Sequence, residues 1–134
     1  MDEEYVTIGR DDHRLSLARA EVSGKSVWSL AATLEADGLT ASTMFWLGPE
    51  GAEDGLDWFF GWLASDWRGW EGARVWDGME GGLTLTCVHS GRVEIGVVLR
   101  HLSGADWTAT ATLVVDPGEQ MTTVARELQR LLAP

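Results

Sequence analysis

The stretch LTLTCVHSGRVEIGVVL, residues 83–99, decides the fold class of this chain. Apolar residues recur at every second position on both sides of the turn-forming tripeptide His89-Ser90-Gly91: Leu83, Leu85 and Cys87 before it, and Val93, Ile95, Val97 and Leu99 after it. A period of two residues is that of a strand with one buried and one wetter face. Two such runs around a short turn predict an antiparallel hairpin.

The same alternation extends in both directions from this hairpin. Upstream it predicts strands over residues 5–8, 13–20, 28–34 and 39–47, with Asp37-Gly38 as the hairpin turn between the last two. Downstream it predicts a strand over residues 107–115. We therefore expect an antiparallel sheet of about seven to eight strands, in a sandwich-like arrangement.

Two segments carry a helical period instead. Over residues 52–67 the apolar side chains follow helical spacing, Glu53 and Asp54 suit the positive helix start, and Gly69 is the expected terminator. The second helix has Asp116 as its expected N-cap, Pro117 at the first helical position and Glu119 completing a capping box. Its apolar stripe consists of Met121, Val124, Ala125, Leu128, Leu131 and Leu132.

These helices do not alternate with strands as strand–helix–strand units. The expected class is therefore α+β, with a central Trp-rich helix and a C-terminal helix packed on the sheet. A length of 134 residues is typical of one domain, and we expect a single domain over residues 1–134.

Composition limits the partners and the compartment. The net charge of −11 disfavours nucleic acids and anionic membranes, because their phosphates would be repelled. The single cysteine, Cys87, cannot form an internal disulfide and is expected to be a buried, inert thiol. The start Met1-Asp2-Glu3-Glu4 is acidic where a signal peptide would be basic, so a cytoplasmic location is expected.

The sequence offers little that would support catalysis. The three histidines, His13, His89 and His101, have no metal-ligand spacing, and neither a nucleophile elbow nor a phosphate-binding loop is present. Carboxylate pairs such as Asp54/Asp57 and Asp77/Glu80 arise by chance in so acidic a chain. We expect no enzyme activity, no cofactor and no metal.

Tryptophan is the most unusual feature, with five of the eight tryptophans between positions 58 and 76. On a helix Trp58 and Trp62 share one face, and they either fill the core or leave an aromatic strip for a partner. Residues 50–80 also hold eight acids against two bases, a net of −6. An acidic, aromatic surface would suit a basic protein partner. The candidate binding residues are Asp54, Asp57, Trp58, Trp62, Asp66 and Trp70.

The motif Asp66-Trp67-Arg68-Gly69-Trp70-Glu71-Gly72 follows the first helix. Arg68 could stack on an indole and pair with Asp66 or Glu71. Two interpretations stay open: a structural lock at the helix exit, or a recognition loop.

At this motif the chain resembles a group of small actinobacterial proteins of unknown function, related in pattern to WapI-type immunity proteins of contact-dependent toxin systems. The matching features are Val6-Thr7-Ile8-Gly9, the hairpin of Trp28 and Leu39, the stretch from Asp66 to Trp70, the hairpin of residues 83–99, and Asp116-Pro117-Gly118-Glu119 before the last helix. The resemblance implies an antiparallel sheet assembly with two packed helices. It implies no functional residue.

We therefore expect a non-enzymatic, acidic protein-binding domain, with an immunity protein that neutralises a basic toxin as its specific form. One alternative is a small-molecule binding module with a pocket lined by Trp28, Trp46 or Trp107. Another is a homo-oligomer that pairs through strand edges or an aromatic face.

Overall fold

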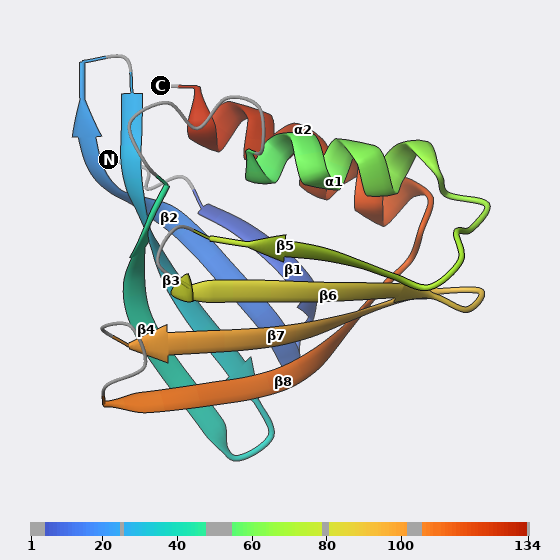
Figure 1. Cartoon of the computed structure of the whole chain (residues 1–134), viewed down its shortest axis with the longest axis horizontal. Helices are drawn as coiled ribbons and strands as arrows, with labels where there is room; N and C mark the ends of the chain where they lie inside the picture. Colours follow the sequence, from blue (N-terminus) through green and yellow to red (C-terminus); the bar gives the residue numbers. More distant parts are fainter. Residues whose placement is uncertain (1–4, 25, 48–54, 79–80, 102–105, 134) are drawn as a thin grey trace.

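The computed structural model of the chain describes residues 5–24, 26–47, 55–78, 81–101 and 106–133. Strands of sheet A follow chain order: β1 (Tyr5–Arg10), β2 (His13–Ser23), β3 (Ser26–Ala36) and β4 (Leu39–Trp46). Sheet B repeats this order with β5 (Ala73–Asp77), β6 (Leu83–His89), β7 (Val93–His101) and β8 (Trp107–Val115). Helix α1 (Leu56–Ser65) comes between the sheets in sequence and α2 (Glu119–Leu132) follows β8 (Figure 1). The predicted α+β class with antiparallel sheets and two helices is confirmed.

The hairpin that decides the fold class is β6–β7. Its strands pair antiparallel with Leu85 opposite Val97 and Cys87 opposite Ile95, and all four of these side chains are buried. The alternation in the sequence therefore marks the inner face of sheet B, as the period of two predicts.

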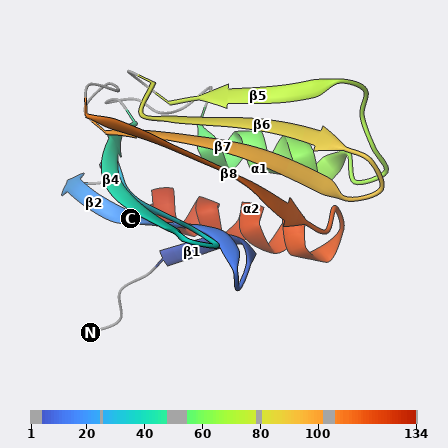
Figure 2. The ribbon, with the colours of Figure 1, turned by 90° about the horizontal axis from the view of Figure 1, so that it is seen from below.

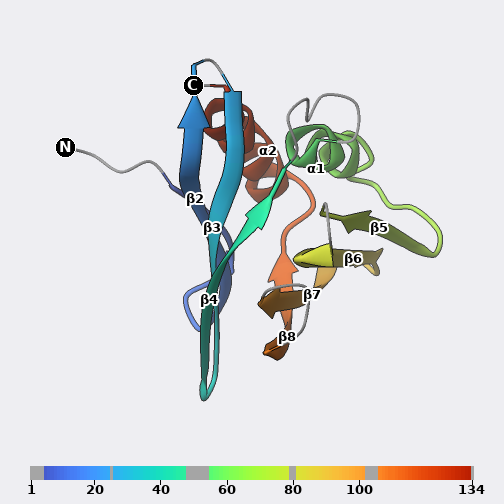
Figure 3. The same ribbon diagram turned by 60° about the vertical axis from the view of Figure 1, so that its left-hand side comes forward.

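The two sheets face each other and diverge toward one side, where both helices lie (Figures 2 and 3). They touch where β8 contacts β1 and β2 and where β4 contacts β7. At one contact a Cβ atom added to Gly82 would lie 2.8 Å from the Cβ of Phe45, so this position has no room for a side chain. The helices complete the core that two diverging sheets would leave open.

Inner faces of both sheets and one face of each helix share a single buried cluster. Helix α2 packs against α1, β1 and β2 and buries most of the predicted stripe, namely Met121, Val124, Ala125, Leu128 and Leu131, while Leu132 is only partly buried. Helix α1 buries Leu56, Phe59, Phe60 and Leu63. In the described part of the chain, no helix has both the length and the apolar character needed to cross a membrane.

The segment around α1 differs from the sequence prediction in two ways. The helix spans Leu56–Ser65 rather than residues 52–67, and the backbone N–H of Asp66 closes it on the carbonyl of Trp62, three residues before Gly69. Residues 52–54 lie outside the described residues. Strand β5 was not predicted at all, because its five residues are dominated by one buried tryptophan, Trp76, and two charged side chains.

The predicted start of α2 is also wrong. The N-cap is Gly118, no side chain caps it, and the helix begins at Glu119 rather than Pro117. Gln120 takes over the role that was assigned to Asp116 and Glu119. Its Oε1 accepts a hydrogen bond from the Asp116 backbone N–H (2.8 Å), and its Nε2 donates to the carbonyl of Gly9 in β1 (3.0 Å). Tertiary contact with sheet A therefore replaces local capping.

Candidate functional site

Helix α1 is two-sided. Its buried side packs into the core, and its other side carries Trp58 and Trp62, whose indoles stack with centroids 5.6 Å apart and an interplanar angle of 27°. Trp58 is 56% exposed and Trp62 is 38% exposed. The helix thus leaves an aromatic strip in contact with solvent, the second of the two outcomes that the sequence allowed.

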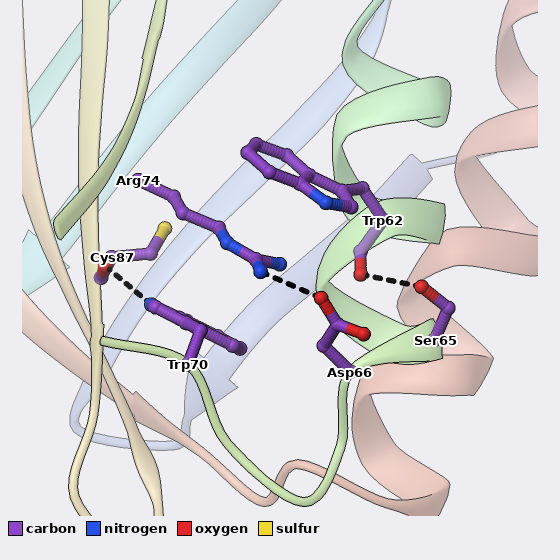
Figure 4. A network of polar contacts seen from close by, with 6 residues as sticks. All are labelled: Trp62, Ser65, Asp66, Trp70, Arg74 and Cys87. Atoms are coloured by element: carbon purple, nitrogen blue, oxygen red, sulfur yellow. Dashed lines mark hydrogen bonds and ion pairs between the residues drawn. The ribbon is translucent and has the colours of Figure 1, made fainter. Parts of the chain in front are cut away.

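Arg74 of β5 lies beneath this strip. Its guanidinium carbon is 3.9 Å from the ring centroid of Trp62 and 4.6 Å from that of Trp70, so the cation is held between two indoles (Figure 4). Nη2 pairs with the Oδ2 of Asp66 at 2.6 Å, and the Arg74 side chain is only 14% exposed. We call Arg74, Trp62, Trp70 and Asp66 the Arg74 sandwich.

The stacking in this sandwich has a physical reason. A guanidinium group is planar and weakly hydrated, so it stacks on aromatic faces at a small desolvation cost. Among the described residues, Nη1 of Arg74 has no hydrogen-bond partner and is buried. The two indole faces and Asp66 are therefore the contacts that hold this charge, and they fix the positions of Trp62 and Trp70 in turn.

Sheet B supports the sandwich from below. The indole N–H of Trp70 donates to the carbonyl of Cys87 (3.3 Å), and the ring of His89 meets Trp70 edge-on at 5.1 Å. The backbone N–H of Gly91 donates to Nδ1 of His89 (3.3 Å), so Nε2 carries the proton and donates to the carbonyl of Trp67 (2.9 Å). The turn of the β6–β7 hairpin thereby anchors the segment that follows α1.

Trp67, two residues after the last residue of α1, is a third exposed indole of this segment, 51% exposed. The guanidinium carbon of Arg68 lies 5.0 Å from its ring centroid, so the predicted stacking of Arg68 on an indole is confirmed. The partner of Asp66, however, is Arg74 and not Arg68. We call Trp58, Trp62 and Trp67 the aromatic surface.

The six candidate residues from the sequence fall into three groups. Trp58 and Trp62 belong to the aromatic surface, and half-exposed Asp57 lies beside them in the first turn of α1. Asp66 and half-buried Trp70 belong to the Arg74 sandwich, where they support the surface. Asp54 lies outside the described residues.

Sequence reasoning missed Arg74 and His89 as parts of this site. Arg74 and Trp76 lie on the same face of β5, where Arg74 contacts Trp62 of α1 and Trp76 packs on Phe45 of β4 (ring centroids 6.2 Å apart), but the strand itself was not predicted. His89 was interpreted only as a turn residue. No sequence signal marks its contact with Trp70, which depends on the distance between α1 and the β6–β7 turn.

Charge is distributed unevenly over the site. Residues 50–80 contain only two bases, Arg68 and Arg74, and each lies over an indole of this same segment. Of the eight acids, the described ones are Asp57, Asp66, Glu71 and Asp77. Arg74 pairs with Asp66, so the other described charges of this segment are the acids Asp57, Glu71 and Asp77 and the base Arg68.

Other chemistry-bearing residues do not gather into a second site. Among the described residues, no three His, Cys, Asp or Glu side chains group as metal ligands. His101 stacks on Trp107 (5.4 Å) and its Nδ1 contacts the Oγ1 of Thr43 (2.8 Å) across the two sheets. Trp28 and Trp46, the other tryptophans expected to line a pocket, are 36% and 42% exposed on sheet A.

Cys87 is fully buried, as predicted, and burial raises the pKa of its thiol to about 12. A thiol with so high a pKa is protonated at neutral pH and is a poor nucleophile. Its backbone carbonyl, not its sulfur, takes part in the site.

Neither the curated proteins nor the solved structures contain a match to this chain. A family model matches residues 6–134, which include both sheets, both helices and the aromatic surface. The chain therefore belongs to the Family of unknown function (DUF6228).

Proposed function

We propose that this chain is a non-enzymatic protein-binding domain whose aromatic surface contacts a basic protein. The observation that carries this proposal is the exposure of Trp58, Trp62 and Trp67, of which Trp62 is held by the Arg74 sandwich and Trp58 stacks on Trp62. Tryptophan dominates the energetic centres of protein interfaces because a large ring is buried at little cost in conformational entropy. Three exposed indoles within ten residues are costly for a soluble domain unless something covers them.

The acidic surroundings favour a basic partner. Residues 50–80 contain eight acids and two bases, and the whole chain carries −11. Long-range attraction of this kind raises the association rate and rejects acidic partners. In the specific form that we propose, the partner is a basic toxin in the cytoplasm, and the domain occludes the surface with which the toxin attracts phosphates. The resemblance to WapI-type immunity proteins supports this form.

Where a gene beside this one encodes a basic toxin, the test is binding of this chain to the purified toxin, measured by calorimetry. We expect a complex whose affinity falls at least tenfold between about 50 and about 500 mM salt, because surface charges are screened over this range. Trp58→Ala and Trp67→Ala should each weaken the complex about tenfold or more. Trp46→Ala, a similarly exposed tryptophan on sheet A, is the matched control and should bind like the wild type. An affinity that does not change with salt or with Trp58→Ala and Trp67→Ala would contradict the proposal.

Self-association is a second candidate, and the outer face of sheet A favours it. One row of aligned residues, Tyr5, Ala18, Ala31 and Met44, crosses all four strands, and the next row is Thr7, Ser16, Thr33 and Ser42. These rows contain no charge, and the ion pair of Arg14 with Glu35 (2.9 Å) lies at their border. A face whose central rows carry no charge is the part of an acidic chain on which two copies meet with the least repulsion.

Light scattering across a dilution series tests this second candidate. We expect a mass that falls from dimer to monomer on dilution, and a monomer at every concentration for Met44→Glu, which places a charge on the exposed face. If the wild-type protein is a monomer at every concentration of the dilution series, self-association is excluded. Because the two surfaces lie on different elements, the outcome leaves the first proposal unchanged.

A further inference from the structure

Tryptophan faces in this domain receive guanidinium groups. Of the two bases in residues 50–80, Arg74 lies between Trp62 and Trp70, and Arg68 lies over Trp67. The chain has nine arginines and one lysine, Lys25, which lies outside the described residues. Both cations of this segment therefore show how a guanidinium group stacks on an indole of this domain.

Trp58 stacks on Trp62, the same ring over which the guanidinium of Arg74 lies. Among the described residues no cation lies over Trp58 itself, and this side chain is the most exposed tryptophan of the cluster. Asp57, the adjacent residue, contributes negative charge next to it.

We propose that the exposed indole of Trp58 receives an arginine side chain of the partner, so that the partner is recognised by an arginine-rich rather than a lysine-rich surface. This inference rests on the proposed protein-binding function and adds the chemistry of the contact. Arginine fits this position better than lysine because its planar guanidinium stacks flat on an indole and loses little hydration, while an ammonium ion is compact and strongly hydrated. A neighbouring carboxylate can hold the edge of the same group, as Asp66 does for Arg74.

The probes are oligo-arginine and oligo-lysine peptides of equal length, titrated at low salt into the folded chain and followed by indole chemical shifts. Charge alone predicts equal affinity for the two peptides. The stacked contact predicts that the arginine peptide binds about threefold to tenfold more tightly, with the largest shift at Trp58. Equal dissociation constants for the two peptides would overturn the inference, and so would binding of neither peptide.

Variants assign the difference to one indole. Trp58→Leu should remove the preference for arginine and keep the binding that both peptides share, while Trp58→Phe, which retains an aromatic face, should keep part of the preference. Trp46→Leu, on sheet A, is the control and should keep the full preference for the arginine peptide. A preference that persists in Trp58→Leu would overturn the inference. If both peptides bind equally and the partner complex still depends on salt and on Trp67, the proposed function stands and only the arginine contact fails.

Discussion

Arg74 lies directly opposite Cys87 in the pairing of β5 with β6. This register places the guanidinium of Arg74 on the inner face of β5, the edge strand of sheet B, under α1. The backbone carbonyl of Cys87 accepts a hydrogen bond from the indole N–H of Trp70 at the same place. One strand pair therefore fixes both the cation and one of the two rings that enclose it. The aromatic surface depends on the edge of sheet B as much as on the helix that displays it.

Replacement of Arg74 should destabilise the fold and loosen the aromatic surface. Arg74→Ala removes two stacking contacts of a largely buried cation, and we expect a loss of about 2–3 kcal/mol in the free energy of unfolding. Arg74→Lys should recover less than half of this loss, since an ammonium lacks the planar shape. The measurement is urea denaturation followed by tryptophan fluorescence.

The control for Arg74 is Arg126, an exposed residue of α2. Arg126→Ala should change the free energy of unfolding by no more than about 0.5 kcal/mol, as surface substitutions do. Equal effects of Arg74→Ala and Arg126→Ala would mean that the sandwich contributes nothing beyond a surface charge.

Periodicity predicted most of the fold because most of its elements bury one face. Buried and more exposed residues alternate along most of residues 83–99 and 107–115, and their buried sides coincide with the inner face of sheet B. Strand β5 escaped detection because an edge strand of five residues with Arg74 and Asp77 contains no alternating apolar run. Its place depends on pairing with β6, a contact that sequence period does not encode.

The candidate site was predictable in part. Helical spacing predicted that Trp58 and Trp62 share a face, and the structure shows them stacked. The partner of Asp66 was beyond local reasoning, since Arg74 is eight residues away and reaches Asp66 only when the chain reverses into β5. Sequence proximity favoured Arg68 for this pair, and tertiary geometry selected Arg74.

Gln120, and not Asp116, should be the side chain that stabilises the start of α2. Gln120→Ala loses the hydrogen bonds to Gly9 and to the Asp116 backbone, and we expect a cost of about 1–2 kcal/mol. Asp116→Ala should cost at most about 0.5 kcal/mol, because its exposed side chain makes no cap hydrogen bond. Thermal unfolding of both variants measures their losses in stability. A larger loss of stability for Asp116→Ala than for Gln120→Ala would support the capping box that the sequence predicted.

Two glycines should respond to alanine with opposite signs. Gly61 lies inside α1 with open space around an added Cβ, so Gly61→Ala should stabilise the protein by about 0.5–1 kcal/mol. Gly82→Ala forces a methyl group against the Cβ of Phe45 where the sheets touch, and should destabilise it by about 1–3 kcal/mol. Chemical denaturation of the two variants and the wild type measures both changes in the free energy of unfolding. A tolerated Gly82→Ala would show that the sheets separate more easily than their contact implies.

Cys87 should make the protein lose stability at alkaline pH. The pKa of the thiol is about 12 in the folded state, because burial disfavours the thiolate, and about 8.5 in an unfolded chain. Above a pH of about 8.5 the unfolded state therefore binds fewer protons than the folded state, and the free energy of unfolding falls as the pH rises. Between a pH of about 7 and a pH of about 10 the contribution of this group is a loss of about 2 kcal/mol.

Other groups also titrate in this range, so the comparison that isolates the thiol is with Cys87→Ala, which has no proton to lose. The variant starts less stable, since it leaves space in the core, but its stability should fall less steeply with pH. The gap between the two proteins should therefore narrow by about 2 kcal/mol from neutral to alkaline pH. A gap that stays constant would mean that the buried thiol ionises as readily in the folded chain as in the unfolded one, and that solvent reaches the floor of the site beneath Trp70.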